Sequence, residues 1–334
     1  MRAYVIRRLF LIVPTLFFVT LIVFFIARFI PGSVIDLMLA QMGGEDASMT
    51  FAELEATAEG LKHALGLDLP VHIQYGRWIG VLPEPDTGFD GILQGNLGVS
   101  LWGRWSIGSE LLRRYPITLE LGVTAMLIAF CVAMPVGVYA AIRQDTTGDY
   151  VGRSFAILAI SLPTFWLGTM VTVYPSIWWN WSPPITYIPL SESITGNLAQ
   201  FLLPAAIQGF HSTGSTMRMT RTMMLEVMRH DYIRTAWAKG LGERTIIYRH
   251  ALKNALIPVV TLIGNHVHIV IGGSVIMEQI FNLPGIGRLM ISALNHRDYP
   301  VISAINLVIA SFIVCVNLLV DLSYAWLDPR VVYK

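Results

Sequence analysis

The chain has 334 residues, of which 54% are hydrophobic and only 13% are charged. Soluble domains carry about 25% charged residues, so this composition excludes an ordinary soluble protein and predicts an integral membrane protein. The formal net charge is +1, which argues against a nucleic-acid partner. Cys131 and Cys315 both lie in apolar runs, so they predict neither a disulfide framework nor a metal site.

The N-terminal part predicts a cytoplasmic end followed by a membrane helix, together residues 1–30. The apolar run 9–30 is about 22 residues long, which is enough to cross a bilayer, and it has no small-x-small cleavage site. Arg2, Arg7 and Arg8 precede this run and place the N-terminus inside, because cytoplasmic segments are enriched in Lys and Arg.

Residues 31–114 are too polar to cross a bilayer and predict an external region with short helices. Within it, 50–65 has apolar residues at helical spacing, which is typical of an amphipathic helix.

Residues 115–334 predict a core of five further membrane helices. The expected spans are 117–142, 154–177, 198–219, 255–277 and 301–326. Pro163 falls inside one of them and is tolerated there if neighbouring groups satisfy the freed backbone. The Lys and Arg residues of the short loops favour both termini inside. We therefore expect an all-α polytopic protein with six transmembrane helices.

A polar stretch, about 230–254, interrupts the apolar core. Its glycines at 240 and 242 divide it into two predicted short amphipathic helices, one ending near Lys239 and one running from Glu243 to Asn254. On charge alone, such a basic pair is usually a solvated cytoplasmic loop.

The spacing within this stretch points to something more specific. Arg-Thr-Ala-x-Ala-Lys-Gly ends at Gly240, and Arg-His-Ala-Leu-x-Asn-Ala-Leu-Ile-Pro ends at Pro258. This resembles the cytoplasmic coupling motif of ABC importer permeases, in its dipeptide and oligopeptide branch. The general motif, Glu-Ala-Ala, three residues, Gly, nine residues, Ile-x-Leu-Pro, is matched at Ala236, Gly240 and Leu252 but not at its leading Glu or closing Pro.

The resemblance covers nearly the whole chain. Further segments similar to that branch are LGLDLP at 65–70, GNLG at 95–98, FNLPGIGRL at 281–289, RDYP at 297–300 and LDPR at 327–330. The chain departs from the family pattern at 33–34, at 105–108 and at 80–92, which looks like an insertion in the external region.

The resemblance implies a type I ABC importer permease in the inner (plasma) membrane of a bacterial or archaeal cell. Its expected partners are a second homologous permease, two ATPase subunits that bind ATP and Mg, an external binding protein that delivers a peptide substrate, and membrane lipid. The chain has no G-x-x-x-x-G-K-[ST] phosphate loop, so we expect no enzyme activity and no catalytic residue here, with ATP hydrolysis in the partners.

The resemblance also implies which residues couple the chain to the ATPases. They are Arg234, Thr235, Ala236, Ala238, Lys239, Gly240, Arg244, His250 and Leu252. Ala236 and Gly240 are small enough for close packing, Lys239 and Arg244 suit partner carboxylates, and Leu252 is a candidate apolar anchor. Arg234 is equally suited to a lipid phosphate.

Two other sets of residues are weaker candidates. Glu278, Arg288, Arg297 and Asp298 flank the last outside loop, as a solvated surface or as an outer gate or binding-protein dock. His211 is a candidate for lining the path, against the alternative of a satisfied polar residue in the bundle. His266 and His268 are two residues apart and do not face each other on a helix, so we predict no metal site.

Alternatives remain open on the sequence alone. The same machinery imports nickel chelates, glutathione-like compounds and oligosaccharides in related systems. An ion-coupled carrier or channel is disfavoured, because the chain has almost no carboxylate near the membrane centre. A membrane-embedded enzyme is disfavoured, because no nucleophile–base or metal-ligand spacing stands out.

Overall fold

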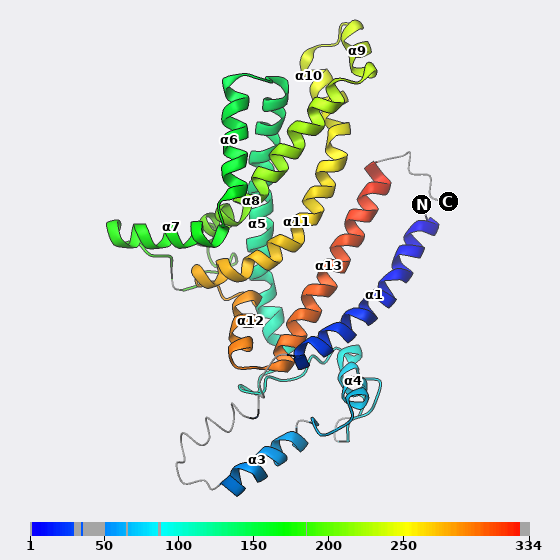
Figure 1. Ribbon diagram of the computed structural model, residues 1–334, viewed down its shortest axis with the longest axis vertical. Helices are drawn as coiled ribbons and strands as arrows, with labels where there is room; N and C mark the ends of the chain where they lie inside the picture. Colours follow the sequence, from blue (N-terminus) through cyan, green and yellow to red (C-terminus); the bar gives the residue numbers. More distant parts are fainter. Residues whose placement is uncertain are drawn as a thin grey trace. The chain divides into compact units, whose positions relative to one another are not determined.

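The computed structural model describes residues 2–29, 35, 51–64, 66–85, 88–184 and 186–327. Within these ranges the chain is mostly helical, and its only extended pairing is two isolated bridges. The helices shown in Figure 1 are α1 (Arg2–Phe29), α3 (Phe51–Ala64), α4 (Val71–Ile79), η1 (Ile92–Gln94), α5 (Ile107–Ile142), α6 (Thr147–Ser161), α7 (Thr164–Trp179), α8 (Ile194–Met228), α9 (Asp231–Ala238), α10 (Glu243–Thr245), η2 (Ile246–Ala251), α11 (Leu252–Ile280), α12 (Ile286–Asn295) and α13 (Tyr299–Leu327). The departure at 33–34 and the tail 328–330 lie outside the described residues.

The chain divides into two compact units. The first contains Met1–Leu9, Pro116–Arg288 and Ile313–Lys334. The second contains Phe10–Tyr115 and Leu289–Phe312.

Four helical segments are long and apolar enough to cross a membrane: 8–26, 107–142, 243–267 and 299–320. The bent pair α6 and α7 adds a fifth if it is counted as one span. These segments confirm a helical membrane protein. The expected span at 198–219 falls on α8, which is long enough but is not apolar enough to belong to this set. Composition therefore supports four or five of the six expected spans.

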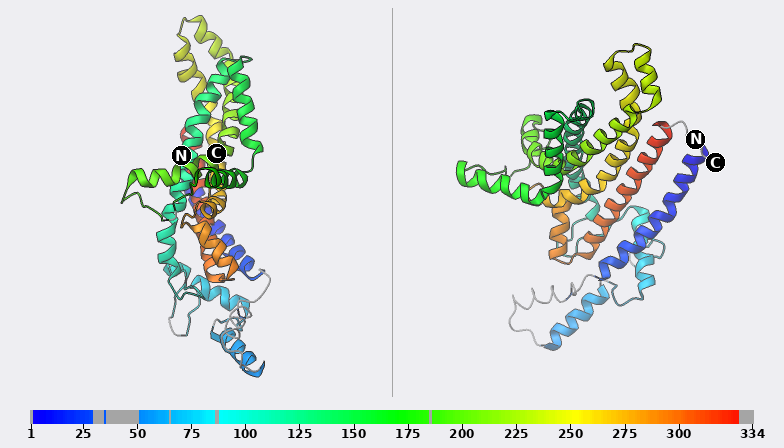
Figure 2. Two further views of the ribbon diagram at one scale, coloured as in Figure 1. Left: turned by 90° about the vertical axis from the view of Figure 1, so that its left-hand side faces the viewer. Right: turned by 45° about the horizontal axis from the view of Figure 1, so that its top comes forward.

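The expected single helix over 154–177 is wrong. Leu162 and Pro163 are extended and separate α6 from α7, whose axes differ by 92°. Proline has no N–H to donate and disfavours the α conformation of the residue before it, so the helix ends at this point. Figure 2 shows α7 leaving α6 sideways in both views.

The first unit is packed around α8. Small residues let its neighbours approach closely: a Cβ on Gly209 would lie 2.5 Å from the Ala125 carbonyl of α5, and one on Gly214 would lie 2.7 Å from the Ala156 carbonyl of α6. Arg221 of α8 donates to both carboxylate oxygens of the buried Asp149 of α6, at 2.7 and 2.8 Å. These contacts position α8 against α5 and α6.

In the second unit, aromatic rings join α1 to α4. Phe24 of α1 packs edge-on against Tyr75 of α4 with ring centroids 5.1 Å apart, and Thr20 and Tyr75 share a hydrogen bond of 2.8 Å between their hydroxyls. The apparent insertion at 80–92 has its two ends together, because a Cβ on Gly91 would lie 2.5 Å from the Gly80 nitrogen. A segment closed in this way lengthens the chain between α4 and η1 without separating the two helices.

Candidate functional site

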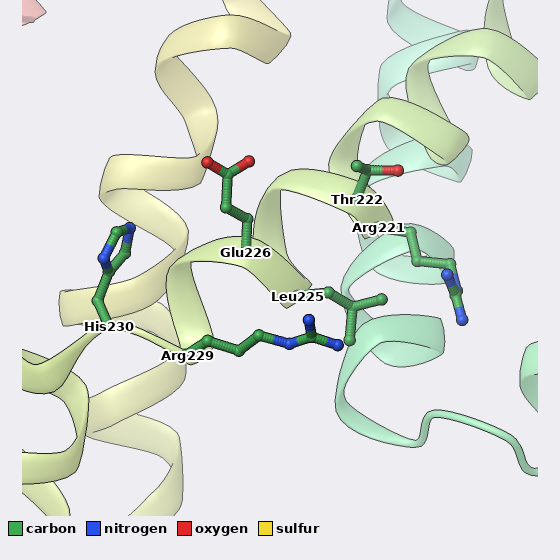
Figure 3. Close-up of a pocket in the computed structure, with 6 residues that line it drawn as sticks. All are labelled: Arg221, Thr222, Leu225, Glu226, Arg229 and His230. Atoms are coloured by element: carbon green, nitrogen blue, oxygen red, sulfur yellow. The ribbon is translucent and has the colours of Figure 1, made fainter.

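The C-terminal end of α8 lies beside an open pocket, and the residues that line this pocket come just before the polar stretch in the sequence. The pocket has a volume of about 490 Å³, and six side chains line it: Arg221, Thr222, Leu225, Glu226, Arg229 and His230 (Figure 3). Five of the six side chains are polar or charged.

The polar stretch begins with α9 and a tight turn at Gly240. The backbone of Gly240 has φ +74°, and its N–H donates to the Trp237 carbonyl at 2.9 Å. This left-handed conformation costs other residues about 1–2 kcal/mol, so the turn favours glycine for conformational reasons. No heavy atom lies within 4 Å of a Cβ placed at this position, so space is not the constraint.

The second predicted helix does not end at Asn254. The chain runs through α10, the π-helical η2 and α11 without a break, and Asn254 and Ala255 both lie inside α11. No glycine or proline occurs between Glu243 and Ile257, so no local signal stops the helix there. The expected pair of short helices is therefore one short helix followed by the start of a long one.

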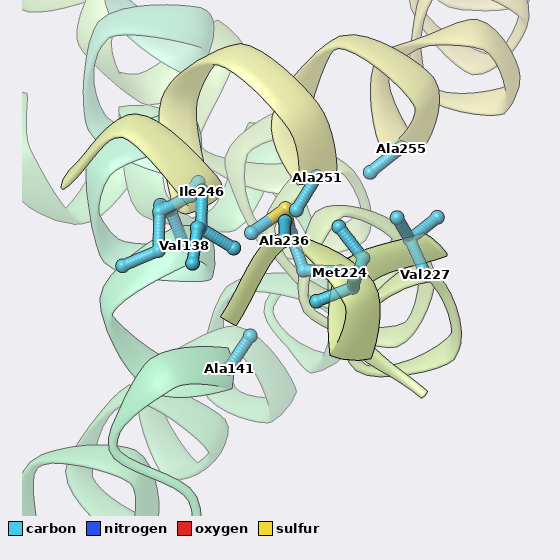
Figure 4. Packing of buried hydrophobic residues seen from close by; sticks show 10 residues of the cluster. Val138, Ala141, Met224, Val227, Ala236, Ile246, Ala251 and Ala255 are labelled. Carbon is cyan, nitrogen blue, oxygen red and sulfur yellow. The ribbon is translucent and has the colours of Figure 1, made fainter. Parts of the chain in front are cut away.

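One face of this stretch is buried against the rest of the first unit. Ile233 and Ala236 of α9 and Ile246, Ile247 and Ala251 of η2 are buried. They belong to one cluster with Val138 and Ala141 of α5 and Met224 and Val227 of α8 (Figure 4). Burying an isoleucine side chain contributes about 1.5–3 kcal/mol, so the stretch is anchored to α5 and α8 rather than solvated on all sides.

A side-chain contact also ties α9 to α11. Asn254 donates from Nδ2 to the Tyr232 hydroxyl at 2.9 Å, and the His230 ring stacks on Tyr232 with centroids 5.8 Å apart. The anchored segment 231–254 therefore has a defined shape, and we call it the platform.

The opposite face of the platform is exposed and mixed in character. Four large apolar side chains are solvent-accessible: Tyr232 (43%), Trp237 (46%), Leu241 (37%) and Tyr248 (62%). Five cations accompany them outside the buried cluster: Arg234, Lys239, Arg244, Arg249 and Lys253. Aromatic residues and arginine are the residue types that dominate binding energy at protein interfaces, so this face has the composition of a docking surface.

The structure places the expected coupling residues on both faces. Arg234, Thr235, Ala238, Lys239, Gly240 and Arg244 are exposed, and His250 is half-buried. Ala236 is buried in the anchoring cluster and Leu252 packs against it, so these two support the platform from within and do not lie on its exposed face. The Arg234–Asp231 ion pair, at 3.4 Å, is exposed on both sides and contributes little.

Sequence reasoning missed the exposed apolar residues. Tyr232 and Trp237 stand next to the buried Ile233 and Ala236, so the buried helical face implies that they point away from it. The position of these aromatic residues could be predicted only once the buried face of α9 was known.

Glu278 holds a turn together. Its buried carboxylate accepts hydrogen bonds from the Thr118 hydroxyl at 2.6 Å and from the Arg288 N–H at 2.9 Å, and Thr118 Oγ1 accepts from the Ile286 N–H at 2.9 Å. A Cβ on Gly285 would overlap this carboxylate. Glu278 thus connects the C-terminal end of α11 and the N-terminal end of α12 to Thr118 of α5.

Asp298 has a similar role in the second unit. Its buried carboxylate accepts a hydrogen bond from the Ser100 hydroxyl at 2.6 Å, and Trp102 Nε1 donates to the His296 carbonyl at 2.7 Å. Arg297 is half-buried with φ +52°. Glu278 and Arg288 belong to the first unit, and Arg297 and Asp298 belong to the second.

His211 lies midway along α8 and is partly exposed. Its buried Nδ1 has no hydrogen-bond partner among the described residues. His266 is buried on α11 with its Nε2 3.3 Å from the Ser215 hydroxyl. The side chain of His268 lies outside the described residues.

Comparison with known proteins identifies the family. Residues 133–333 match the family described as the binding-protein-dependent transport system inner membrane component, and residues 1–122 match the N-terminal region of such membrane components. The chain is 36% identical over 359 aligned residues to the dipeptide transport system permease protein DppB of Escherichia coli K12, covering all of both chains. It is 35% identical over 351 residues to the di/tripeptide transport system permease protein DppB of Pseudomonas aeruginosa, covering 99% of each.

Among solved structures, the fold is similar to a chain of the MetNI methionine ABC transporter in an inward-facing form. The TM-score is 0.50 at 16% identity, over 65% of this chain and 96% of that one. The resemblance seen in the sequence is therefore confirmed, and the protein belongs to the inner-membrane permease family of binding-protein-dependent transport systems.

Proposed function

We propose that this chain is the permease subunit of an ATP-driven importer of short peptides, and that the exposed face of its platform docks on one of the two ATPase subunits of the complex. The observation that carries the peptide assignment is the full-length similarity to two permeases named for dipeptide and di/tripeptide transport. An external binding protein delivers the peptide, and a second, homologous permease forms the other half of the path. ATP and Mg bind to the ATPase subunits.

The architecture of the platform supports a role in coupling. Shifting a two-state equilibrium from 1:99 to 99:1 takes about 5.5 kcal/mol of differential binding. A flexible loop would not transmit this free energy to the membrane helices. The platform instead shares a buried cluster with α5 and α8 and continues directly into α11. A displacement imposed on its exposed face therefore moves three helices of the permease together.

The docking chemistry follows from the exposed side chains. Trp237 and Tyr248 are suited to fill apolar pockets on the ATPase, and Lys239 and Arg244 are suited to face carboxylates at the rim. The proposed topology has six membrane helices and cytoplasmic termini, with α8 as the span that composition alone does not reveal.

The test is to isolate the complex and measure transport. We would purify the chain from its own membranes in mild detergent, identify the co-purifying subunits by mass spectrometry, and reconstitute the complex in liposomes with its binding protein. Uptake of radiolabelled dialanine that depends on ATP and on the binding protein is the expected result. Recovery of the chain alone after crosslinking, or uptake driven by an ion gradient without ATP, would contradict the proposal.

A further inference from the structure

α7 packs on the rest of the first unit only along its first half. Leu167 and Val171 lie against a buried cluster built from α5, α8 and α11. A Cβ on Gly168 would lie 3.1 Å from the side chain of Met277 in α11. These contacts fix the direction in which α7 leaves the bundle.

The second half of α7 is uncovered. Ile177, Trp178 and Trp179 follow one another and are 65–71% exposed. Successive residues of a helix point about 100° apart, so exposure of all three leaves this end of α7 open around most of its circumference. A large apolar surface of this kind needs an apolar cover.

Nothing in α7 calls for water as that cover. No Asp, Glu, Lys, Arg or His lies between Arg153 and Glu192. The hydroxyls of Thr169 and Thr172 donate to carbonyl oxygens of their own helix at 2.9 and 3.1 Å, so they need no further partner. A helix that is apolar all round belongs in a protein core or in lipid.

The packing of α6 shows how α7 is oriented. α6 runs antiparallel to α8, with Asp149 bonded to Arg221 at one end and Gly214 close to the Ala156 carbonyl further along. In the proposed topology α8 crosses the membrane, so α6 crosses it as well. The axis of α7 is turned by 92° from that of α6 and therefore lies close to the membrane plane (Figure 1).

The length of α6 sets the depth of α7. Its 15 residues extend over about 22 Å. The hydrocarbon core of a bilayer is about 30 Å thick, so an α6 that begins at the inner boundary ends about 8 Å below the outer one. Helices that lie in an interface are buried about 5–10 Å into the boundary between headgroups and acyl chains, which is the depth at which α7 leaves α6.

The loop after α7 stays near the same level. Asn197 Nδ2 donates to the Ile188 carbonyl at 3.1 Å, and Gln200 Oε1 accepts from the Ile188 N–H at 3.0 Å. Both amides belong to the first two turns of α8, so the loop returns directly to the start of that helix. The exposed Trp178, Trp179 and Trp181 lie where the chain turns back, and tryptophan is enriched at membrane interfaces.

We propose that α7 lies flat in the outer interface of the membrane, and that its second half is a lipid-binding surface anchored by tryptophan. This inference rests on the proposed import function for the direction in which α8 crosses the membrane. α6 alone then supplies the third membrane crossing, and the bilayer beside it is thinned to match its short length.

The test measures depth by spin labelling in the assembled complex, reconstituted in liposomes of phosphatidylethanolamine and phosphatidylglycerol. In a Cys131→Ser, Cys315→Ser background, a nitroxide is attached at Trp166→Cys or at Ile177→Cys. Both positions are exposed, and eleven residues place them three turns apart on one side of α7. Collision rates with oxygen, which concentrates in lipid, and with a water-soluble nickel chelate report the depth of each label.

A second pair of variants and a control complete the design. Phe165→Cys and Ser176→Cys have the same spacing on another side of α7 and are also exposed, so the test does not depend on one pair. The matched control is Val151→Cys with Leu158→Cys, two exposed positions seven residues apart on one side of α6.

We expect the two labels of each α7 pair to differ in depth by less than about 5 Å, the rise of one helical turn. A helix that crossed the membrane would separate them by about 16 Å, at 1.5 Å per residue. The two α6 labels should differ by about 10 Å for the same reason. Oxygen should reach the Ile177→Cys label freely, because lipid and not protein surrounds it.

A depth difference of about 16 Å along α7 would overturn the inference, and so would equal depths of the two α6 labels. Low collision rates of the Ile177→Cys label with both reagents would overturn it as well, because a protein partner such as the second permease would then cover α7. Loss of ATP-driven dialanine uptake by the unlabelled complex would instead count against the proposed function, since the depth measurement does not depend on transport.

Discussion

Two glycines illustrate how single residues are constrained in different ways. Gly240 is needed for its backbone conformation, with open space around it, whereas Gly285 is needed because the carboxylate of Glu278 occupies the space that a side chain would take. That carboxylate is buried and hydrogen-bonded to Thr118 and to the backbone of Arg288. It therefore cannot move aside without leaving polar groups unsatisfied.

We predict that Gly285→Ala lowers the thermal stability of the purified protein by displacing Glu278. Leaving a buried polar group without its partners costs about 1–3 kcal/mol, which is a shift of several degrees in the unfolding midpoint of a domain of moderate size. The control is Gly60→Ala, since nothing lies within 4 Å of that site and alanine favours a helix. Equal unfolding midpoints for the two variants, measured by scanning fluorimetry, would mean that the Glu278 contacts do not hold the turn.

At the scale of the element, the platform combines a fixed face with a free one. Its buried isoleucines and alanines hold it to α5 and α8, and its exposed aromatic and basic side chains are available to a partner. Gly242 lies on the exposed side with φ −68°, and no atom is within 4 Å of its Cβ position. A large side chain can therefore be added at Gly242 without backbone strain, which Gly240 does not permit.

We predict that Gly242→Trp abolishes ATP-driven uptake, or detaches the ATPase subunits, while the chain remains inserted and folded. The added indole would obstruct docking on the exposed face. Gly60→Trp is the matched control, because it adds the same side chain at an equally open glycine of α3, and it should transport normally. Normal uptake by Gly242→Trp would remove the platform from the coupling mechanism.

For the whole molecule, the positions of the polar segments predict the arrangement across the membrane. The region around Gly60 is expected outside and the short turn between α5 and α6 inside, on the basis of the Lys and Arg distribution. In the expected orientation, the platform lies on the cytoplasmic side, where ATP is available.

We predict that a cysteine at the exposed Glu59, in a Cys131→Ser, Cys315→Ser background, reacts with a membrane-impermeant maleimide in intact spheroplasts. A cysteine at the exposed Gln144, between α5 and α6, should react only after permeabilisation. Labelling of Gln144→Cys in intact spheroplasts would invert the topology and exclude docking of cytoplasmic ATPases on the platform.

The fold class, the family and the polar stretch of this protein can be predicted from the sequence, because the residues that indicate them are close together in the chain. Low charge and long apolar runs identify a helical membrane protein, and the spacing around Gly240 identifies the family and the segment that interrupts the apolar core. The expected spans 255–277 and 301–326 end within three residues of the ends of α11 and α13, whereas α5 begins ten residues before the expected 117.

The tertiary structure decided what depends on contacts between distant parts of the chain. Only packing against α5 and α8 distinguishes Ala236, inside the platform, from Trp237 on its surface. The partnership of Glu278 with Thr118 joins residues 160 positions apart, and no local pattern encodes it. The contact between Ser215 of α8 and His266 of α11 likewise joins residues far apart in the chain, because burial is a property of neighbours and not of the residues themselves.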